Sequence, residues 1–157
     1  MNINYQASVA IQSAEFFNFL SPGGGAKETP IHAAPWINVW EAWKIINFND
    51  PSSTANVKFG DIVSFENNNF SSRFLSGFPG YVQVTTMDAM QDFERWKLVD
   101  PTNPSSTADI TTANLFVLQL VNGGGSHHAQ VTGENIQQSV PLGSLGSEFR
   151  LIQLSVS

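Results

Sequence analysis

The sequence predicts an all-β fold assembled from three similar segments, and two observations carry that prediction. The first is a repeat: the pentapeptide PSSTA begins at residue 51 and again at residue 104, which is an offset of 53. The second is a series of short segments in which apolar and polar residues alternate, separated by Asn, Gly and Pro every 8–14 residues. Alternation with that spacing is typical of strands in a barrel or sandwich.

The same offset of 53 relates three further tripeptides near the end of each segment. Trp43-Lys44-Ile45 is followed by Trp96-Lys97-Leu98 and then by Phe149-Arg150-Leu151. Three such periods account for nearly all 157 residues, so we expect a single domain, residues 1–157, with units at about 1–53, 54–106 and 107–157. Three equivalent aromatic residues are expected to fill one layer of a shared core.

The middle copy predicts four short strands, at residues 61–65, 72–75, 81–86 and 95–99. Residues 67–69 (Asn-Asn-Asn) and 77–80 (Gly-Phe-Pro-Gly) have the composition of turns between them. Residues 87–96 show helical spacing, but the third copy has Pro and Gly in the same stretch. We therefore expect a loop there, with one helical turn in the second copy.

Three units with four short strands each resemble the β-trefoil superfamily over essentially the whole chain. The resemblance implies a six-stranded barrel capped by three hairpins. In ricin-type lectins the last strand of each unit carries Gln-any-Trp, and this sequence has Glu41-Ala42-Trp43, Glu94-Arg95-Trp96 and Ser147-Glu148-Phe149. Ricin-type sites use an Asp early in a unit. The first unit has no Asp before Asp50, the third has none after Asp109, and Asp61 of the second comes too early, so the galactose constellation does not carry over. Residues 59–65 and 73–76 also resemble fascin-like trefoils.

Composition excludes several classes of partner and cofactor. The net charge is −6 and the seven Lys and Arg residues are scattered, which argues against nucleic acid and anionic membranes. No apolar run reaches the roughly 18 residues of a membrane span, so no membrane insertion is expected. There is no cysteine, and no cofactor or metal site is expected. No signal peptide is visible, which favours a cytoplasmic or non-classically secreted protein.

Candidate ligand-binding residues form three groups of aromatic and uncharged polar side chains. Aromatic faces stack on sugars, and amides both donate and accept hydrogen bonds. Each group has a structural alternative: a Trp that seals the barrel, an Asn run at a hairpin tip, or exposed loop histidines. Adjacent histidines on a strand point to opposite faces, so they would not chelate one metal. The candidates are Trp36, Asn38 and Trp40; Asn67, Asn69, Arg73 and Tyr81; and His127 and His128.

These features predict a non-catalytic carbohydrate-binding protein, or lectin, with glycans or glycoproteins as partners and a role in defence as one compatible use. No Gly-x-Ser-x-Gly elbow or other catalytic set is present, so an enzyme is not expected. Weak single sites would gain avidity from several units or from a homodimer. The alternatives are a trefoil-type protease inhibitor, using residues 21–36 or 102–110, and a fascin-like cytoskeletal or structural module.

Overall fold

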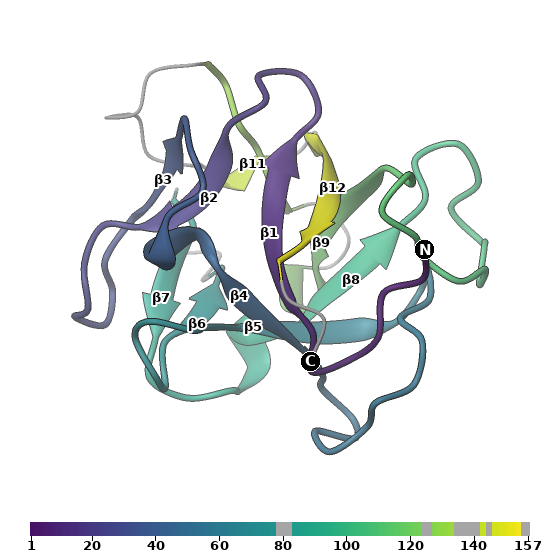
Figure 1. Ribbon diagram of the computed structural model, residues 1–157, viewed down its shortest axis with the longest axis horizontal. Coiled ribbons are helices and arrows are strands. Elements are labelled where there is room, and N and C mark those ends of the chain that lie inside the picture. The colour runs from purple at the N-terminus through teal and green to yellow at the C-terminus, as the bar shows by residue number, and fades with distance from the viewer. Residues whose placement is uncertain (78–82, 124–126, 134–141, 144–145, 155–157) are drawn as a thin grey trace.

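Six antiparallel strands close a barrel in the computed structural model (Figure 1). The structure describes residues 1–77, 83–123, 127–133, 142–143 and 146–154. Each barrel strand pairs with two other barrel strands, in the closed cycle β1–β4–β5–β8–β9–β12–β1. The barrel strands are β1 (Ser8–Ser13), β4 (Trp43–Asn47), β5 (Ile62–Asn67), β8 (Trp96–Val99), β9 (Phe116–Leu120) and β12 (Glu148–Gln153). The predicted all-β class is confirmed.

Three hairpins extend from this barrel, one after each of the strands β1, β5 and β9. Short 3-10 helices η1 (Val39–Glu41), η2 (Asp92–Glu94) and η3 (Val121–Gly123) complete the secondary structure of the described residues. The helical turn expected in the second copy is η2, and the first copy has the equivalent turn η1. The hairpin strands are β2 (Phe19–Pro22), β3 (Ile31–Ala34), β6 (Phe74–Ser76), β7 (Thr85–Met87), β10 (His128–Ala129) and β11 (Leu142–Gly143).

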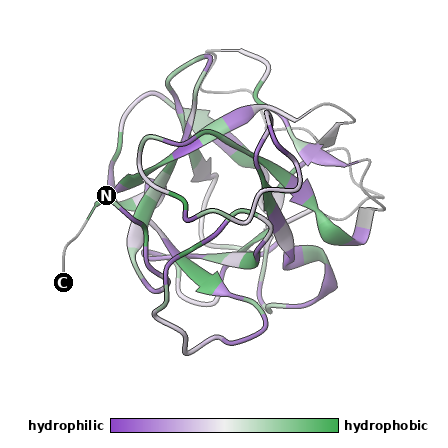
Figure 2. Ribbon diagram, turned by 90° about the vertical axis from the view of Figure 1, so that its right-hand side faces the viewer, coloured by the Kyte–Doolittle hydropathy of each residue, from purple (hydrophilic) through white to green (hydrophobic). Residues whose placement is uncertain are grey.

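The three repeated aromatic residues fill the barrel, as the sequence predicts. Trp43, Trp96 and Phe149 are all fully buried. The two indoles also fix the hairpins, because Nε1 of Trp43 donates to the Leu20 carbonyl at 3.0 Å and Nε1 of Trp96 to the Leu75 carbonyl at 2.9 Å. Hydrophobic and hydrophilic residues alternate along the barrel ribbons in Figure 2, as expected for strands with one buried face.

One end of the barrel is closed by the segments that lead into the strands. Ile3, Val57 and Ile110 occupy equivalent positions and are fully buried. Their backbones form a cycle: Ile3 N–H donates to Ile110, Ile110 to Val57 and Val57 to Ile3, at 3.1, 2.8 and 2.8 Å. A cycle of three equivalent bonds leaves none of these buried amides without a partner, and it ties the three copies together.

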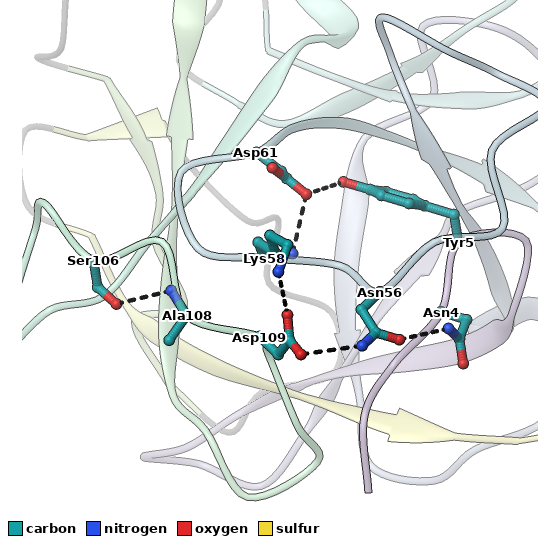
Figure 3. Close-up of polar contacts among 8 residues, drawn as sticks. All are labelled: Asn4, Tyr5, Asn56, Lys58, Asp61, Ser106, Ala108 and Asp109. Carbon is teal, nitrogen blue, oxygen red and sulfur yellow. Dashed lines mark hydrogen bonds and ion pairs between the residues drawn. The ribbon is translucent and has the colours of Figure 1, made fainter.

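A polar network surrounds this closed end (Figure 3). Asp109 accepts hydrogen bonds from Asn56 Nδ2 at 3.0 Å and from Lys58 Nζ at 2.5 Å. These contacts lower the pKa of Asp109, and the contact with Lys58 contributes most. Asp61 accepts from the Lys58 amide at 3.0 Å and from the Tyr5 hydroxyl at 2.5 Å. Burial, and then the hydrogen bond to Asp61, raise the pKa of Tyr5 well above its usual range.

The repeated PSSTA peptides form the same local turn in both copies. The hydroxyl oxygen of Ser53 accepts from the Ala55 amide and that of Ser106 from the Ala108 amide, both at 3.2 Å. The two alanine carbonyls then accept backbone hydrogen bonds from the closed end of the barrel, from residues 5 and 59. The repeat therefore shapes the entry into the barrel, because serine side chains that bond nearby amides stabilise turns.

Candidate functional site

The connector between β3 and β4 presents apolar side chains to solvent. Trp36 is 70% exposed, Val39 65%, Trp40 40% and Ile37 36%. Four such side chains within five residues concentrate exposed apolar surface on one connector, which on a folded protein marks a binding surface more often than isolated apolar residues do. We call residues 35–40, together with Asn68 and Asn69, the Trp36 surface.

Glu41 explains why this segment faces outward. Its side chain is only 4% exposed. Its Oε1 accepts from the Asn38 amide at 2.7 Å, which caps η1, and its Oε2 accepts from the Ser21 hydroxyl at 2.5 Å. Glu41 anchors η1 to β2, so the side chains before it are held on the outside. Asn38 itself is exposed, and its backbone amide is the donor that Glu41 caps.

The Asn-rich turn after β5 lies directly against this connector, and Asn67 forms its internal frame. Asn67 is 1% exposed. Its Nδ2 donates to the Trp40 carbonyl at 2.8 Å, and its Oδ1 accepts from the amides of Asn69 and Phe70, both at 3.0 Å. The structure thus places Asn67 beneath the surface as a turn-forming residue, whereas Asn69 is exposed. The hairpin-tip interpretation accounts for Asn67.

Aromatic stacking and one arginine join three segments at this place. The rings of Trp40 and Phe70 lie 5.3 Å apart between centroids, tilted by 59°. Phe70 in turn lies against the backbone of Gly25 at the tip of the β2–β3 hairpin, where an added Cβ would be 2.8 Å from the ring. Arg73 Nε donates to the Gly25 carbonyl at 2.7 Å. Arg73 therefore positions the hairpin tip beside the Trp36 surface.

A shallow depression of about 220 Å³ lies within the Trp36 surface. It is lined by Val39, Ala42, Asn68 and Asn69. The Asn68 amide donates to the Ala42 carbonyl at 2.9 Å, so the turn and the connector are fixed relative to each other. The site therefore combines a fixed backbone with exposed indoles and uncharged amides. The indoles can pack against an apolar face of a ligand, and the amides can form hydrogen bonds with hydroxyl groups.

The remaining predicted candidates lie elsewhere. His127 precedes β10 and His128 lies within it, on the third hairpin, where both are half-buried. Tyr81 lies outside the described residues. Within the described ranges, no group of three His, Asp or Glu side chains is arranged to hold a metal ion. No described helix has the length and apolar character needed to cross a membrane.

Sequence reasoning missed the roles of the two glutamates that replace the Gln of the ricin-type pattern. Glu94 is 3% exposed and repeats the contacts of Glu41: it accepts from the Ser76 hydroxyl at 2.5 Å and from the Gln91 amide at 2.9 Å. Burial, reinforced by the charges of Asp92 and Asp88, raises the pKa of Glu94. The available signal was the tripeptide Phe-Leu-Ser, which ends at Ser21 and again at Ser76, 20 and 18 residues before the two glutamates.

Comparison with solved structures shows a trefoil-like fold. The chain is similar to a Caenorhabditis elegans protein of unknown function, with a TM-score of 0.74 and 13% identity over 97% of this chain and 96% of the other. An SDF2-like protein from Arabidopsis thaliana gives a TM-score of 0.71 and 13% identity, over 97% and 95% of the two chains. The designed 3-fold symmetric protein ThreeFoil gives a TM-score of 0.65 and 9% identity, over 94% of this chain and 99% of the other. At such identities the likeness concerns the fold alone.

The sequence comparisons add no family to this result. No protein-family model matches the chain. A search of curated proteins likewise finds no match.

Proposed function

We propose that this protein is a non-catalytic carbohydrate-binding protein, a lectin built as a single β-trefoil domain of three units, and that the Trp36 surface is its glycan site. The observation that carries the proposal is the indole of Trp36, which is 70% exposed on the same connector as a second exposed Trp and as Val39, which lines a depression together with two asparagines. Leaving this much aromatic surface in water is unfavourable unless a ligand covers it.

The chemistry of the surface suits a neutral sugar ring. The apolar face of a hexose packs on the exposed indole of Trp36, while the amides of Asn38 and Asn69 exchange hydrogen bonds with its hydroxyls. Trp40 is held by Phe70, so that part of the platform loses little freedom on binding. A shallow site of this size buries few ligand atoms, so each site binds weakly and avidity comes from further sites or from a homodimer.

The test is binding of the purified protein to a glycan array, followed by titration of the best glycan with tryptophan fluorescence as the readout. Trp36→Ala should weaken binding by about tenfold, because an aromatic contact contributes about 0.5–1.5 kcal/mol beyond the area that it buries, and 1.4 kcal/mol corresponds to about a factor of ten. Asn69→Ala should weaken it by a smaller factor. The matched control is Phe17→Asn, which removes an aromatic side chain that is 62% exposed outside the patch and should leave binding unchanged.

Two results would overturn the proposal. One is an array without hits together with unchanged tryptophan fluorescence on addition of sugars. The other is a glycan that binds the Trp36→Ala variant as tightly as the unchanged protein. Co-sedimentation with actin filaments, retained in that variant, would point to the fascin-like alternative.

One structural feature favours the protease-inhibitor alternative, namely the exposed loop between β2 and β3. Its tip is braced at several points: Arg73 bonds the Gly25 carbonyl, the Thr29 hydroxyl donates to the Ala26 carbonyl at 2.5 Å, and the Glu28 amide donates to the Thr86 carbonyl at 2.5 Å. A braced, exposed loop is the form of segment that rigid inhibitors present to proteases. Inhibition within a panel of serine and cysteine proteases, lost on cleavage or substitution of this loop, would support that function.

A further inference from the structure

A second hollow, of about 590 Å³, lies between the turn that follows β1 and the first residues of β12. Its volume falls in the range of sites for small molecules. The lining is rich in groups that form hydrogen bonds and includes both a cation and two carboxylates. The polar lining residues are Glu15, Gln130, Thr132, Ser147, Glu148 and Arg150.

Two glycines beside the hollow bring its walls close together. A Cβ on Gly143 would lie 2.0 Å from the Oε1 atom of Gln130, so the Gln130 amide crosses directly over the backbone of β11. A Cβ on Gly146 would lie 3.1 Å from Val117 Cβ. Ser147 fixes the adjacent segment, because its hydroxyl oxygen accepts from the Val131 amide at 2.8 Å. The hollow therefore has a framework that the chain itself holds in place.

Arg150 is the unusual group in this lining. It lies on β12 between Phe149 and Leu151, which point into the core, so its own side chain faces outward. Its Nε atom is buried and has no hydrogen-bond partner. Among the described residues, no carboxylate forms an ion pair with its guanidinium. A buried donor without a partner is unfavourable, so the described chain does little to offset the charge of this guanidinium.

The equivalent position in the first copy shows what Arg150 lacks. Lys44 occupies that position on β4, faces Glu66 on β5 and forms an ion pair with it at 3.3 Å. Arg150 faces Gln12 instead. The amide of Gln12 cannot neutralise the guanidinium. The third copy therefore has a cationic group without an ion pair in the lining of the hollow, whereas the first copy has an ion pair at the equivalent position.

The carboxylates of Glu15 and Glu148 restrict the ligand further. Both residues are exposed, and both line the hollow. A lining with one guanidinium and two carboxylates repels a dianion such as phosphate about twice as strongly as a monoanion at the same place. A ligand with one carboxylate and several hydroxyls fits better. Its carboxylate accepts two hydrogen bonds from the guanidinium, and its hydroxyls donate to the glutamates.

We propose that this hollow is a second binding site, separate from the Trp36 surface, for a sugar residue that carries a carboxylate, as in a uronic acid. The carboxylate pairs with Arg150, and the ring hydroxyls bond Gln130 and the two glutamates. The site goes beyond the proposed lectin function and does not depend on Trp36. A free hydroxy acid shares the same chemistry, so the test must separate the two sources.

The experiment is calorimetric titration of the full chain with three probes: methyl glucuronide, its uncharged methyl ester, and gluconate as an open-chain hydroxy acid. The glucuronide should bind at least about tenfold more tightly than the ester, because a charge-assisted hydrogen bond contributes more than a neutral one. Tighter binding of the glucuronide than of gluconate assigns the site to a sugar. The opposite order assigns the site to free hydroxy acids and overturns the sugar proposal.

Variants test whether Arg150 is the contact. Arg150→Gln should reduce glucuronide affinity about tenfold or more, and Arg150→Lys should give an intermediate loss, since lysine keeps the charge without the two-pronged geometry. Lys97→Gln, at the equivalent position on β8, is the matched control and should bind as the unchanged protein does. Trp36→Ala should also leave glucuronide binding unchanged, so this site and the Trp36 surface can fail independently.

Equal binding of the glucuronide and its ester to the unchanged protein would overturn the proposal without any variant. So would the absence of binding by all three probes at millimolar concentration, or unchanged glucuronide affinity in a folded Arg150→Gln variant. Folding of each variant is checked by its circular dichroism spectrum.

Discussion

Replacing Trp96 with Phe tests how the barrel layer is held together. The third copy already has Phe at the equivalent position 149, so the fold accepts the smaller ring there. At position 96 two interactions are lost. One is the hydrogen bond of 2.9 Å from Nε1 to the Leu75 carbonyl, which contributes about 1 kcal/mol. The other is the buried outer part of the indole, which contributes about 1–2 kcal/mol.

We therefore expect Trp96→Phe to lower the free energy of unfolding by about 2–3 kcal/mol, within the 5–15 kcal/mol typical of a domain. The assay is equilibrium unfolding in urea, followed by far-ultraviolet circular dichroism, with the slope against urea concentration unchanged. A loss below about 1 kcal/mol would contradict the burial and hydrogen bonding on which the estimate depends.

Gly77 supplies a sharper version of the same test, because it packs directly against the indole. A Cβ at position 77 would lie 2.9 Å from Cη2 and 3.1 Å from Cζ2 of Trp96, and 3.2 Å from Leu120 Cδ1. Gly77→Ala should therefore destabilise the protein by about 1–3 kcal/mol through overpacking. Phenylalanine lacks the two nearest atoms, so the same substitution should have a much smaller effect in the Trp96→Phe background.

The double-mutant cycle of these two substitutions should give a coupling free energy of about 1–2 kcal/mol, with the double variant more stable than additivity predicts. Additive effects would refute the packing of Gly77 on Trp96.

Two further predictions concern pH. Burial raises the pKa of Glu94, so its contribution to stability is fully present below the unfolded pKa of about 4.3 and is lost as the pH rises through the higher folded pKa. Glu94→Gln should accordingly gain stability relative to the unchanged protein as the pH rises above about 4.3. The measurement is urea unfolding at each pH, and a constant difference between the two proteins would contradict this. Lys58 lowers the pKa of Asp109, so the stability from this pair is present above the unfolded pKa and is lost as the pH falls through the folded one. Asp109→Asn should make the free energy of unfolding depend less on pH in the acid range. An unaltered pH dependence would show that the pair contributes nothing to folding.

The repeat made much of the core predictable. Trp43, Trp96 and Phe149 share one offset and proved fully buried, because equivalent positions in a repeated barrel meet around a common axis. The alternation of apolar residues also located strands of the middle copy. The ends of three of them differ from the prediction by one or two residues, whereas the strand predicted at residues 81–86 is observed as Thr85–Met87. The limits of a strand depend on pairing with distant segments, so local composition cannot fix them.

The candidate site was predictable only in part. Trp36, Asn38, Trp40 and Asn69 are all exposed, as their residue types suggested. Asn67 looks identical to Asn69 in the sequence, yet it is buried and bonds the Trp40 carbonyl. The difference arises because Asn67 is the last residue of a barrel strand, whereas Asn69 lies at the tip of the turn. Binding of glycans by these residues stays a prediction.

The sequence by itself determined the all-β class, the period of 53 and the aromatic layer, because periodicity and hydrophobic alternation are properties of the chain. Only the tertiary structure decided which side chains neutralise each other across the copies. Lys44 meets Glu66 whereas Arg150 meets Gln12, and that pairing depends on strand register across the closed barrel. Residues so far apart in the chain come together only when the barrel closes, and for that reason the hollow beside Arg150 could not be found from the sequence.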